Sequence, residues 1–453
     1  MNKNYPKIRF SEFEKAFEEN GGEQNSENPY AWEQRKLGEV FDFSVSTNSL
    51  SRSQLNYDKG EIKNVHYGDI LVNYGSILDV ETDKIPFITD GLLDKYKPNL
   101  LKNGDVIFAD AAEDDTVGKA VEVNGLSDKN LVSGLHTIVA RPMEKMADFF
   151  IGYYINSNIY HSQLLKLMQG TKVSSISKIN LKKTIVSYPE NLDEQKKIGG
   201  YLRLLDTTIT LHQRKLKTLE KMKKSYLQKL FPKNGEQNPE IRFTEFKKLF
   251  EENGGGQNSE NPYAWEQRKL KDIVNRVTRK NKNLESTLPL TISAQYGLVD
   301  QITFFNKQIA SKDVSGYYLL QKGEFAYNKS YSKDFPWGAI KRLDMYDEGV
   351  LSTLYIAFRP FKVNSDFLVS YYETDGWHKE VAIRAAEGAR NHGLLNITAV
   401  DFFDTGLLIP PNNDEQQEIG GFFIELDHTI TLHQRKLKAL QDMKKSLLQK
   451  MFI

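Results

Sequence analysis

The feature that most constrains the fold is a helical segment that occurs twice in the 453-residue chain. Residues 193–231 (DEQKKIGGYLRLLDTTITLHQRKLKTLEKMKKSYLQKLF) and 414–452 (DEQQEIGGFFIELDHTITLHQRKLKALQDMKKSLLQKMF) are identical at 27 of 39 aligned positions. Apolar residues recur in steps of four and three, which is typical of a coiled-coil seam. The residues predicted to pair the helices are Ile198, Leu205, Ile209, His212, Leu216, Leu219, Ile419, Leu426, Ile430, His433, Leu437 and Leu440.

Each helix would extend about 58 Å at ~1.5 Å per residue, which exceeds most globular cores and suits a spacer. An apolar period kept over several heptads favours supercoiling, so we expect the two copies to pack on each other. The alternative is that each stripe docks separately onto its own globular domain. His212 and His433 stand at the two midpoints, so full antiparallel overlap predicts that they face each other.

A second repeat precedes each half of the chain. Residues 6–38 and 239–271 are identical at 27 of 33 positions, and we call each copy an arm. In the first arm, Ser11 is predicted to begin a short capped helix that ends at Asn20 and Gly21. The apolar arm residues, such as Trp32 and Leu37, are expected to be docking contacts.

The segments between the repeats, 39–192 and 272–413, do not resemble each other and differ by 12 residues in length. Their predicted strands are 69–72, 105–108, 134–140, 290–293, 323–327 and 354–358, and their predicted helices are 148–168 and 366–386. The predicted parts are an arm with a first domain (1–192), a helix with its linker (193–238), an arm with a second domain (239–413) and a second helix (414–453).

The topology follows from the short connection between the halves. Only residues 232–238 separate the first helix from the second arm, so that helix must end beside the second domain, where the second helix begins. The fold class is therefore α+β, with two mixed domains separated by two long antiparallel helices in a coiled coil. Because Ile453 would return to the first domain, the arrangement is expected to be circular with a pseudo-two-fold axis.

Composition bounds the class of protein. The chain has no cysteine and no apolar run near the ~20 residues that span a bilayer, and its start lacks the apolar core of a signal peptide, so we expect a cytoplasmic location without a membrane partner. The net charge is only +1, so nucleic-acid binding would require local clusters of basic residues. Residues 193–231 carry ten basic and four acidic residues, whereas residues 414–452 carry six of each.

This order of parts resembles the DNA-specificity subunit of type I restriction-modification enzymes. The resemblance rests on the duplicated layout, on the PKIRF and PEIRF arms that end in WEQRKL, and on the entries to the two helices. The entry residues are Pro189, Asp193, Glu194, Gln195, Ile198, Pro411, Asp414, Glu415, Gln416 and Ile419.

The resemblance implies a non-catalytic subunit in which each central domain is a target-recognition domain for half of a bipartite duplex DNA site. The helices would set the spacing and hold two methylation subunits, and restriction subunits would join the complex. No cofactor is expected in this chain. S-adenosylmethionine for adenine methylation, and ATP and Mg²⁺ for cleavage and translocation, are expected in the partner subunits.

Two other classes of function stay open at this point. One is a self-contained endonuclease with a divergent metal site, for which Asp42 and the triplet Glu61-Ile62-Lys63 are a weak pattern. The other is a two-headed protein-interaction scaffold. The chain has no phosphate-binding GxxxxGK[ST] loop, and Asn28-Pro29-Tyr30 lacks the second proline of an amino-methyltransferase motif, so we interpret it as part of the arm.

Clustered donors and aromatic residues indicate the DNA-binding surface. Basic side chains position a protein on phosphates, whereas Arg and Asn also specify bases. The predicted DNA-binding residues are Lys166, Thr171, Lys172, Ser174, Lys178, Lys329, Tyr331, Lys333, Trp337, Arg384, Arg390 and Asn391. The histidines His66, His136, His161, His378 and His392 have no metal-ligand spacing, and we expect surface or hydrogen-bonding roles for them.

Overall fold

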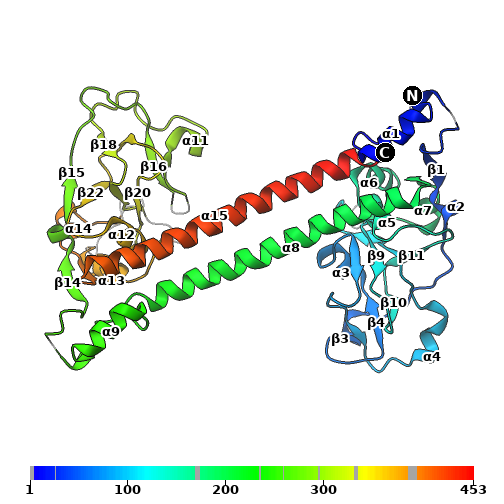
Figure 1. The fold of residues 1–453 in the computed structure, drawn as a ribbon, viewed down its shortest axis with the longest axis horizontal. Helices are drawn as coiled ribbons and strands as arrows, with labels where there is room; N and C mark the ends of the chain where they lie inside the picture. The colour runs from blue at the N-terminus through cyan, green and yellow to red at the C-terminus, as the bar shows by residue number, and fades with distance from the viewer. Residues whose placement is uncertain are drawn as a thin grey trace. The chain divides into compact units, whose positions relative to one another are not determined.

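The computed structural model describes residues 5–25, 27–168, 174–233, 236–258, 260–293, 296–330, 335–385 and 395–453. The chain forms two compact units. Unit 1 comprises Met1–Gln213 and Arg435–Ile453, and unit 2 comprises Arg214–Gln434. Each unit contains one arm, one mixed domain and half of each long helix (Figure 1). The boundaries at residues 192, 238 and 413 that were expected from the sequence remain predictions.

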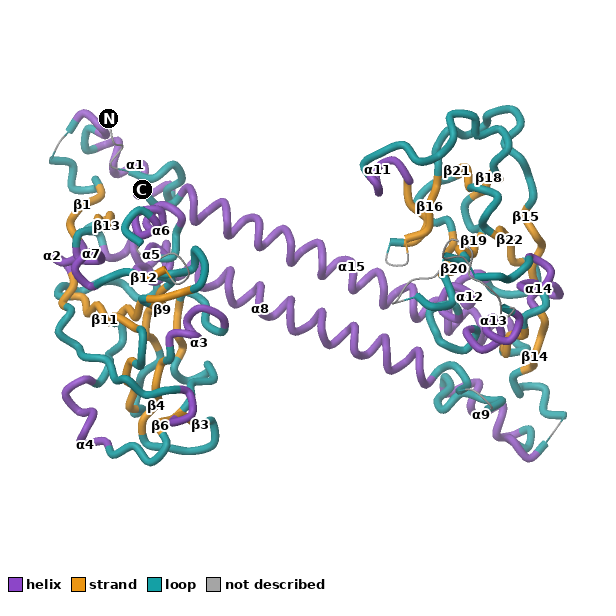
Figure 2. The backbone as a smooth tube through the Cα atoms, turned by 180° about the vertical axis from the view of Figure 1, so that it is seen from behind, coloured by secondary structure: helices purple, strands orange, loops and turns teal. Residues whose placement is uncertain are grey.

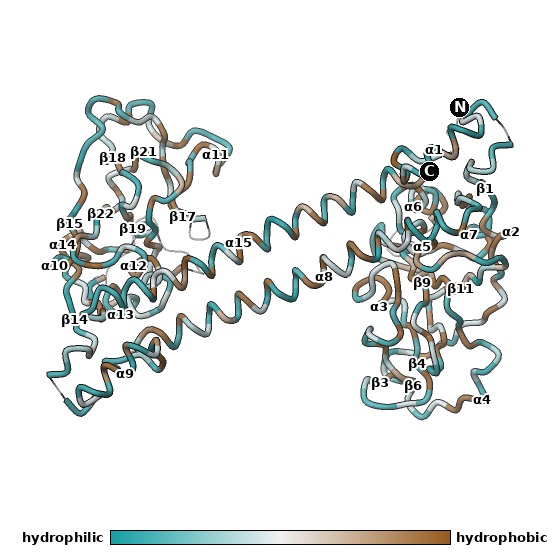
Figure 3. The backbone as a smooth tube through the Cα atoms, in the orientation of Figure 1, coloured by the Kyte–Doolittle hydropathy of each residue, from teal (hydrophilic) through white to brown (hydrophobic). Residues whose placement is uncertain are grey.

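The long helices are α8 (Leu192–Lys229) and α15 (Asn413–Lys450), each of 38 residues, and their ends lie within two residues of the predicted limits. Hydrophobic and hydrophilic residues follow each other along both helices (Figure 3). In unit 2, Lys223 Nζ lies 2.6 Å from Asp427 Oδ1, and further along α8 the Tyr226 ring lies 5.0 Å from the ring of Phe422. Since later residues of α8 meet earlier residues of α15, the paired segments are antiparallel.

The apolar stripe serves two purposes along each helix. Near its start, α8 packs Ile198 and Leu202 into the core of unit 1, and α15 packs Ile419 and Phe423 into the core of unit 2. Within unit 2, the stripe residues that pack between the helices are Leu216, Leu219, Leu426 and Ile430. Docking onto a domain and helix pairing therefore both occur, over different stretches. His212 and His433 belong to different units, and their pairing stays a prediction.

Unit 1 is built on two sheets with helices packed against them. The five-stranded sheet has the order β2 (Phe41–Asp42), β11 (Thr137–Pro142), β7 (Val106–Ala109), β9 (Ala120–Asn124) and β5 (Ile77–Asp79). The four-stranded sheet has the order β10 (Asn130–Ser133), β4 (Ile62–Val65), β6 (Phe87–Ile88) and β3 (Leu55–Asn56). Two-stranded pairs join β1 (Trp32–Lys36) to β13 (Ile185–Pro189), and β8 (Ala111–Ala112) to β12 (Ser174–Ser175).

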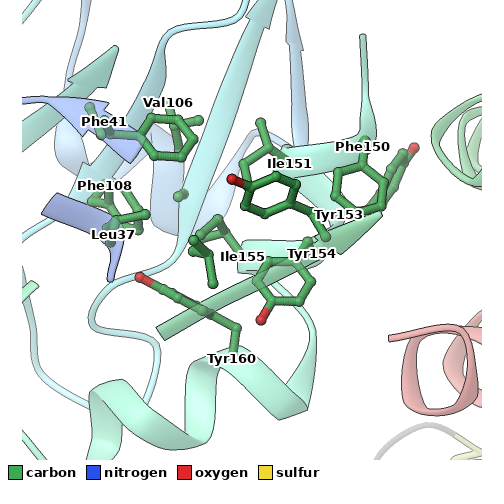
Figure 4. Close-up of a cluster of buried hydrophobic side chains, with 14 of the residues drawn as sticks. Leu37, Phe41, Val106, Phe108, Phe150, Ile151, Tyr153, Tyr154, Ile155 and Tyr160 are labelled. Atoms are coloured by element: carbon green, nitrogen blue, oxygen red, sulfur yellow. The ribbon is translucent and has the colours of Figure 1, made fainter. Parts of the chain in front are cut away.

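The shorter helices of unit 1 are α1 (Ser11–Glu19), α2 (Leu37–Val40), α3 (Tyr67–Val72), α4 (Leu93–Tyr96), α5 (Phe150–Ile155), α6 (Asn158–Leu165) and α7 (Lys178–Lys182). Helices α5, α6 and α7 gather where α8 begins, and β3, β4 and β6 lie at the other end of the unit (Figure 2). Strand β7 is buried on both faces. Val106 and Phe108 pack with α5, as Figure 4 shows, and Ile107 and Ala109 face a second apolar cluster.

Unit 2 has a smaller central sheet in the order β15 (Val274–Val277), β22 (Ile356–Pro360), β19 (Phe325–Asn328) and β20 (Ala339–Arg342). Its strand pairs are β14 (Glu266–Lys269) with β23 (Gly406–Ile409), β16 (Leu290–Ser293) with β17 (Gly297–Asp300), and β18 (Tyr318–Gln321) with β21 (Glu348–Leu351). Its shorter helices are α9 (Thr244–Glu252), α10 (Leu270–Ile273), α11 (Gln301–Phe305), α12 (Ser365–Tyr371), α13 (His378–Arg384) and α14 (Ala399–Phe403).

Three local predictions are wrong. Residues 69–72 are part of helix α3 and not a strand, because the His66 side chain accepts a hydrogen bond from Gly68 N and caps a helix there. The predicted helix 148–168 is broken into α5 and α6, since Ser157 caps a new helix by accepting from Tyr160 N. The predicted helix 366–386 is likewise divided into α12 and α13. Ser11 is the first residue of α1, whose N-cap is Phe10 without a side-chain hydrogen bond.

Each arm is held to its unit by a buried ion pair at the start of a long helix. Arg9 Nε and one of its terminal nitrogens donate to the two carboxylate oxygens of Glu194 at 2.7 and 2.6 Å, and Trp32 Nε1 lies 3.4 Å from the same carboxylate. The two charged side chains are only 3% and 0% exposed, so solvent does not screen them.

Unit 2 repeats this ion pair with the equivalent residues of the second arm. Arg242 Nε donates to Glu415 at 2.8 Å, and Trp265 Nε1 lies 3.4 Å from the same carboxylate. The residue that precedes each of these arginines is fixed as well. Ile8 N donates to the last residue of α15, Lys450, at 2.9 Å, and Ile241 N donates to Lys229 of α8 at 3.0 Å. Each arm therefore joins the start of one long helix to the end of the other.

The next residue of the helix motif fastens the domain. Gln195 donates to Pro189 O at 2.7 Å and accepts from Ala147 N at 3.0 Å, which ties the end of β13 to the segment before α5. Gln416 makes the equivalent bonds, to Pro410 O at 2.8 Å and from Asn364 N at 2.8 Å. We call the Arg–Glu pair and this glutamine together the arm–helix junction.

The paired glycines of the motif have different roles. A Cβ added at Gly199 would lie 2.8 Å from Asp148 O and from Phe150 N, and one at Gly420 would lie 2.6 Å from Phe367 N. Only glycine therefore fits at these two positions, where α8 contacts the start of α5 and α15 contacts the start of α12. At Gly200 and Gly421 a Cβ would meet nothing within 4 Å.

This difference predicts opposite effects of alanine at neighbouring positions. Gly199→Ala or Gly420→Ala should destabilise its unit by about 1–3 kcal/mol, because the methyl group meets rigid backbone. The matched variants Gly200→Ala and Gly421→Ala should be neutral or stabilising by up to ~1 kcal/mol, since alanine favours a helix. Urea unfolding followed by circular dichroism measures all four. Equal stability of the members of each pair would contradict the close approach.

A buried carboxylate caps the start of α5. Glu122 of β9 is fully buried and accepts hydrogen bonds from Phe149 N at 2.6 Å and Gly152 N at 2.8 Å. Burial raises the pKa of Glu122 to about 7, and the two backbone donors oppose this rise. The folded chain therefore holds a proton on Glu122 more tightly than the unfolded chain, in which the pKa is about 4.5.

The Glu122 pKa predicts a pH dependence of stability. Because the folded state binds the extra proton, the contribution of Glu122 to the free energy of unfolding should fall as pH rises from about 4.5 to about 7. Glu122→Gln cannot titrate, so its stability should vary less over this window. Thermal unfolding of both proteins at closely spaced pH values provides the measurement, and parallel profiles would refute the assignment.

Candidate nucleic-acid interface

The described DNA-contact candidates of unit 1 lie at the end of α6, in β12 and in α7. Ser174 belongs to β12 and pairs with Ala112 of β8. Lys166 is exposed at the C-terminal end of α6. Lys178 begins α7, and its Nζ donates to Phe43 O at 2.9 Å, which holds it against the domain. Thr171 and Lys172 lie outside the described residues.

The described candidates of unit 2 have intramolecular partners. Lys329 Nζ donates to Ile397 O at 3.3 Å, and Trp337 packs against the apolar core while its carbonyl accepts from Tyr327 Oη at 2.8 Å. Arg384 donates to Glu380 Oε2 at 2.7 Å and to Asp404 O at 2.9 Å, and thus ties α13 to the turn after α14. Tyr331, Lys333, Arg390 and Asn391 lie outside the described residues.

These contacts separate two groups of candidates. Lys166 and Ser174 are positioned on the surface of unit 1, whereas Arg384 has a structural role in unit 2. The DNA contacts of all twelve residues stay a prediction. The sequence identifies residue types that can bind DNA. Hydrogen bonds between segments that are distant in the chain then determine which of these side chains remain available to a ligand.

Sequence reasoning missed a second group near β12, which stands at the ends of β4 and β7 and the start of β11. His66 and Tyr67 follow β4, Asp110 follows β7, and His136 precedes β11. The Tyr67 ring lies 4.7 Å from the ring of His66 and 5.2 Å from the ring of His136. No spacing in the sequence relates these residues, because the sheets bring them together.

The basic group beside this cluster is already neutralised. Arg52 donates to both oxygens of Asp69, at 2.7 and 2.9 Å, and the carboxylate is only 2% exposed. Hydrogen bonding to Asp69 raises the pKa of Arg52. Burial, and then the nearby Arg52 charge, lowers the pKa of His66. His66 Nδ1 accepts from Gly68 N at 3.2 Å, so this side chain caps α3.

The residues of the enzymatic alternatives have structural partners. Asn28 donates to Phe17 O at 2.8 Å and Asn261 to Phe250 O at 2.8 Å, which supports their interpretation as arm residues. Lys63 Nζ donates to Val80 O at 2.9 Å. Within the described ranges, no group of three or more His, Cys, Asp or Glu residues is placed to hold a metal ion. No helix of the described chain is long and apolar enough to cross a membrane.

Comparison with known proteins agrees with this architecture. Residues 29–221 match the family model of the type I restriction modification DNA specificity domain. Over 207 residues the chain is 25% identical to a putative type I restriction enzyme MjaX specificity subunit of Methanocaldococcus jannaschii, which covers 45% of this chain and 46% of that protein. The MjaVIII specificity subunit of the same organism is 26% identical over 206 residues, or 44% of this chain and 45% of that protein. These alignments span about half the length of either relative.

The fold is similar to a crystal structure of the S subunit of a type I restriction-modification system from M. genitalium. The TM-score is 0.57 at 16% sequence identity, and the match covers 99% of each chain. Residues 29–221 are thus similar in sequence to specificity subunits of type I restriction-modification systems, and the fold of the chain is similar to that of one such subunit.

The contacts of Arg384 and Lys166 predict different consequences of their removal. Arg384→Ala should lower the free energy of unfolding of unit 2 by about 1–2 kcal/mol, because Glu380 and Asp404 O lose their donor; the partial exposure of Arg384 limits the effect. Lys166→Ala, on the surface of unit 1, should change stability by less than about 0.5 kcal/mol. Urea unfolding compares them. Equal, small effects would show that the Arg384 contacts do not support unit 2.

Proposed function

We propose that this chain is the non-catalytic, sequence-reading subunit of a type I restriction-modification complex. Each unit reads one half of a bipartite duplex DNA site, and the long helices set the distance between the halves. The observation that carries this proposal is that equivalent arm–helix junctions hold two different domains. Glu194 and Glu415 bind equivalent arms, whereas the central sheets differ in strand number and order.

The division of labour in the complex follows from this role. Two methylation subunits bring S-adenosylmethionine and modify adenine, and restriction subunits bring ATP and Mg²⁺ for translocation and cleavage. The chain itself binds DNA and its partner subunits, without a cofactor of its own, in the cytoplasm. The proposed DNA contacts are among the twelve sequence-predicted residues, of which Lys166 is exposed and Ser174 is half-buried in unit 1.

The proposal predicts the result of exchanging one domain for a copy of the other. Replacing residues 39–192 by a second copy of residues 272–413 should give a protein that folds, because each graft meets the junction residues that it already has. If the two equal readers have the pseudo-two-fold arrangement expected from the sequence, the recognised site should become an inverted repeat of the second half-site. Mapping of methylated adenines in cells that supply the partner subunits measures this.

The controls separate the proposed function from its alternatives. The unaltered chain should direct methylation to an asymmetric bipartite site, and the purified chain with Mg²⁺ alone should neither cut nor methylate DNA. An active hybrid that still methylates the original first half-site would place the DNA address outside the exchanged segments. Cleavage by the purified chain would favour the endonuclease alternative.

A further inference from the structure

A single exposed imidazole interrupts an otherwise buried stretch of unit 1. In residues 131–140, every residue except Leu135 and His136 is buried, and His136 is the exposed one. His136 has φ 55°, in the left-handed region that residues with a Cβ rarely adopt. Such a conformation costs on the order of 1 kcal/mol, and glycine or asparagine would form the same turn with less strain. The turn by itself therefore does not explain a histidine.

Two contacts with one aspartate orient this imidazole. Asp110 N donates to His136 O at 3.1 Å, and His136 Nδ1 lies 3.3 Å from Asp110 Oδ1. The edge-on Tyr67 ring supports the imidazole from another element. The His136 side chain remains 50% exposed. Since Nδ1 faces the carboxylate, Nε2 is the nitrogen that remains for a ligand.

The position of His136 joins it to the predicted DNA surface of unit 1. Asp110 O accepts from Ile176 N at 2.9 Å, directly after the β12 residues Ser174 and Ser175. The same aspartate thus connects the His136 turn with the β8–β12 pair. The other carboxylate of this cluster, Asp69, is bound by Arg52, so it does not repel a negatively charged ligand from His136.

We propose that His136 is a DNA contact of unit 1, and that its Nε2–H donates to an acceptor of the duplex, a phosphate oxygen or the N7 edge of a purine. This rests on the proposed function and adds a residue to it. An imidazole that carries a hydrogen on each ring nitrogen donates from both, here to the carboxylate at Nδ1 and to a ligand at Nε2. Phosphate oxygens and guanine N7 and O6 accept such hydrogen bonds.

The test uses His136→Asn in the full chain, assembled with its methylation subunits. Asparagine tolerates the left-handed turn, so the thermal stability should be unchanged, but its shorter side chain cannot reach the ligand position of Nε2. His428→Asn is the matched control, because His428 is exposed on α15 and its equivalent on α8 is Thr207. Binding is measured with a library of duplexes carrying randomised positions, from which the wild-type complex selects its motif.

His136→Asn should bind the selected duplex roughly ten-fold more weakly, the size of one good contact, while His428→Asn binds as the wild type does. If His136 contacts a base, one position of one half-site should lose its preference. If it contacts phosphate, the motif should stay the same and the salt dependence should decrease by about one phosphate. Unchanged affinity and motif in His136→Asn would overturn the proposal. Failure of the wild-type complex to select any motif would instead overturn the proposed function.

Discussion

The buried Arg–Glu ion pair at the start of each long helix is the interaction on which the rest of the structure depends. Two charges removed from water are stable only when each satisfies the other, and removal of one partner from such a pair costs about 3–5 kcal/mol. Arg9 with Glu194, and Arg242 with Glu415, meet this requirement with two parallel hydrogen bonds each. The geometry is demanding, so an arm binds its helix in one orientation only, and every element attached to the arm inherits that orientation.

The arm–helix junction is separate from the domain that it carries. In unit 1, Gln195 binds only backbone atoms of the domain, and Gly199 allows the backbone of the domain to approach α8 closely. Neither contact depends on the side chains inside the domain. The domain can therefore change its sheet, its length and its surface without loss of its attachment. This independence agrees with a protein whose two halves have nearly identical arms and helices and dissimilar central segments, and it gives the surfaces of the two domains freedom to differ.

The sequence predicted the connecting parts well, whereas the surroundings of the candidate interface residues depend on segments that are distant in the chain. Helices α8 and α15 follow from an apolar stripe that is local and periodic, so their limits were predicted to within two residues. The prediction of a strand at 69–72 is wrong because the His66 side chain caps a helix there. Arg384 appeared equivalent to Lys166 as a basic residue near aromatic groups, but a distant carbonyl, Asp404 O, occupies its guanidinium. The sequence did not identify His136 as part of this cluster, since its partners come from other strands.

By itself, the sequence determined the duplication, the two long helices, the antiparallel pairing imposed by a short connection and the resemblance to the specificity subunits of type I restriction-modification systems. These properties depend on periodicity, on repeated residues and on chain length, all of which can be counted along the chain. Only the tertiary structure determined which charged side chains are buried, which glycine of each pair contacts the backbone of the domain, and which side chains form a cluster at the surface. Asp110, Tyr67 and His136 form one cluster because two strands, β4 and β7, end where a third, β11, begins, and hydrogen bonds between strands that are distant in sequence set that meeting point.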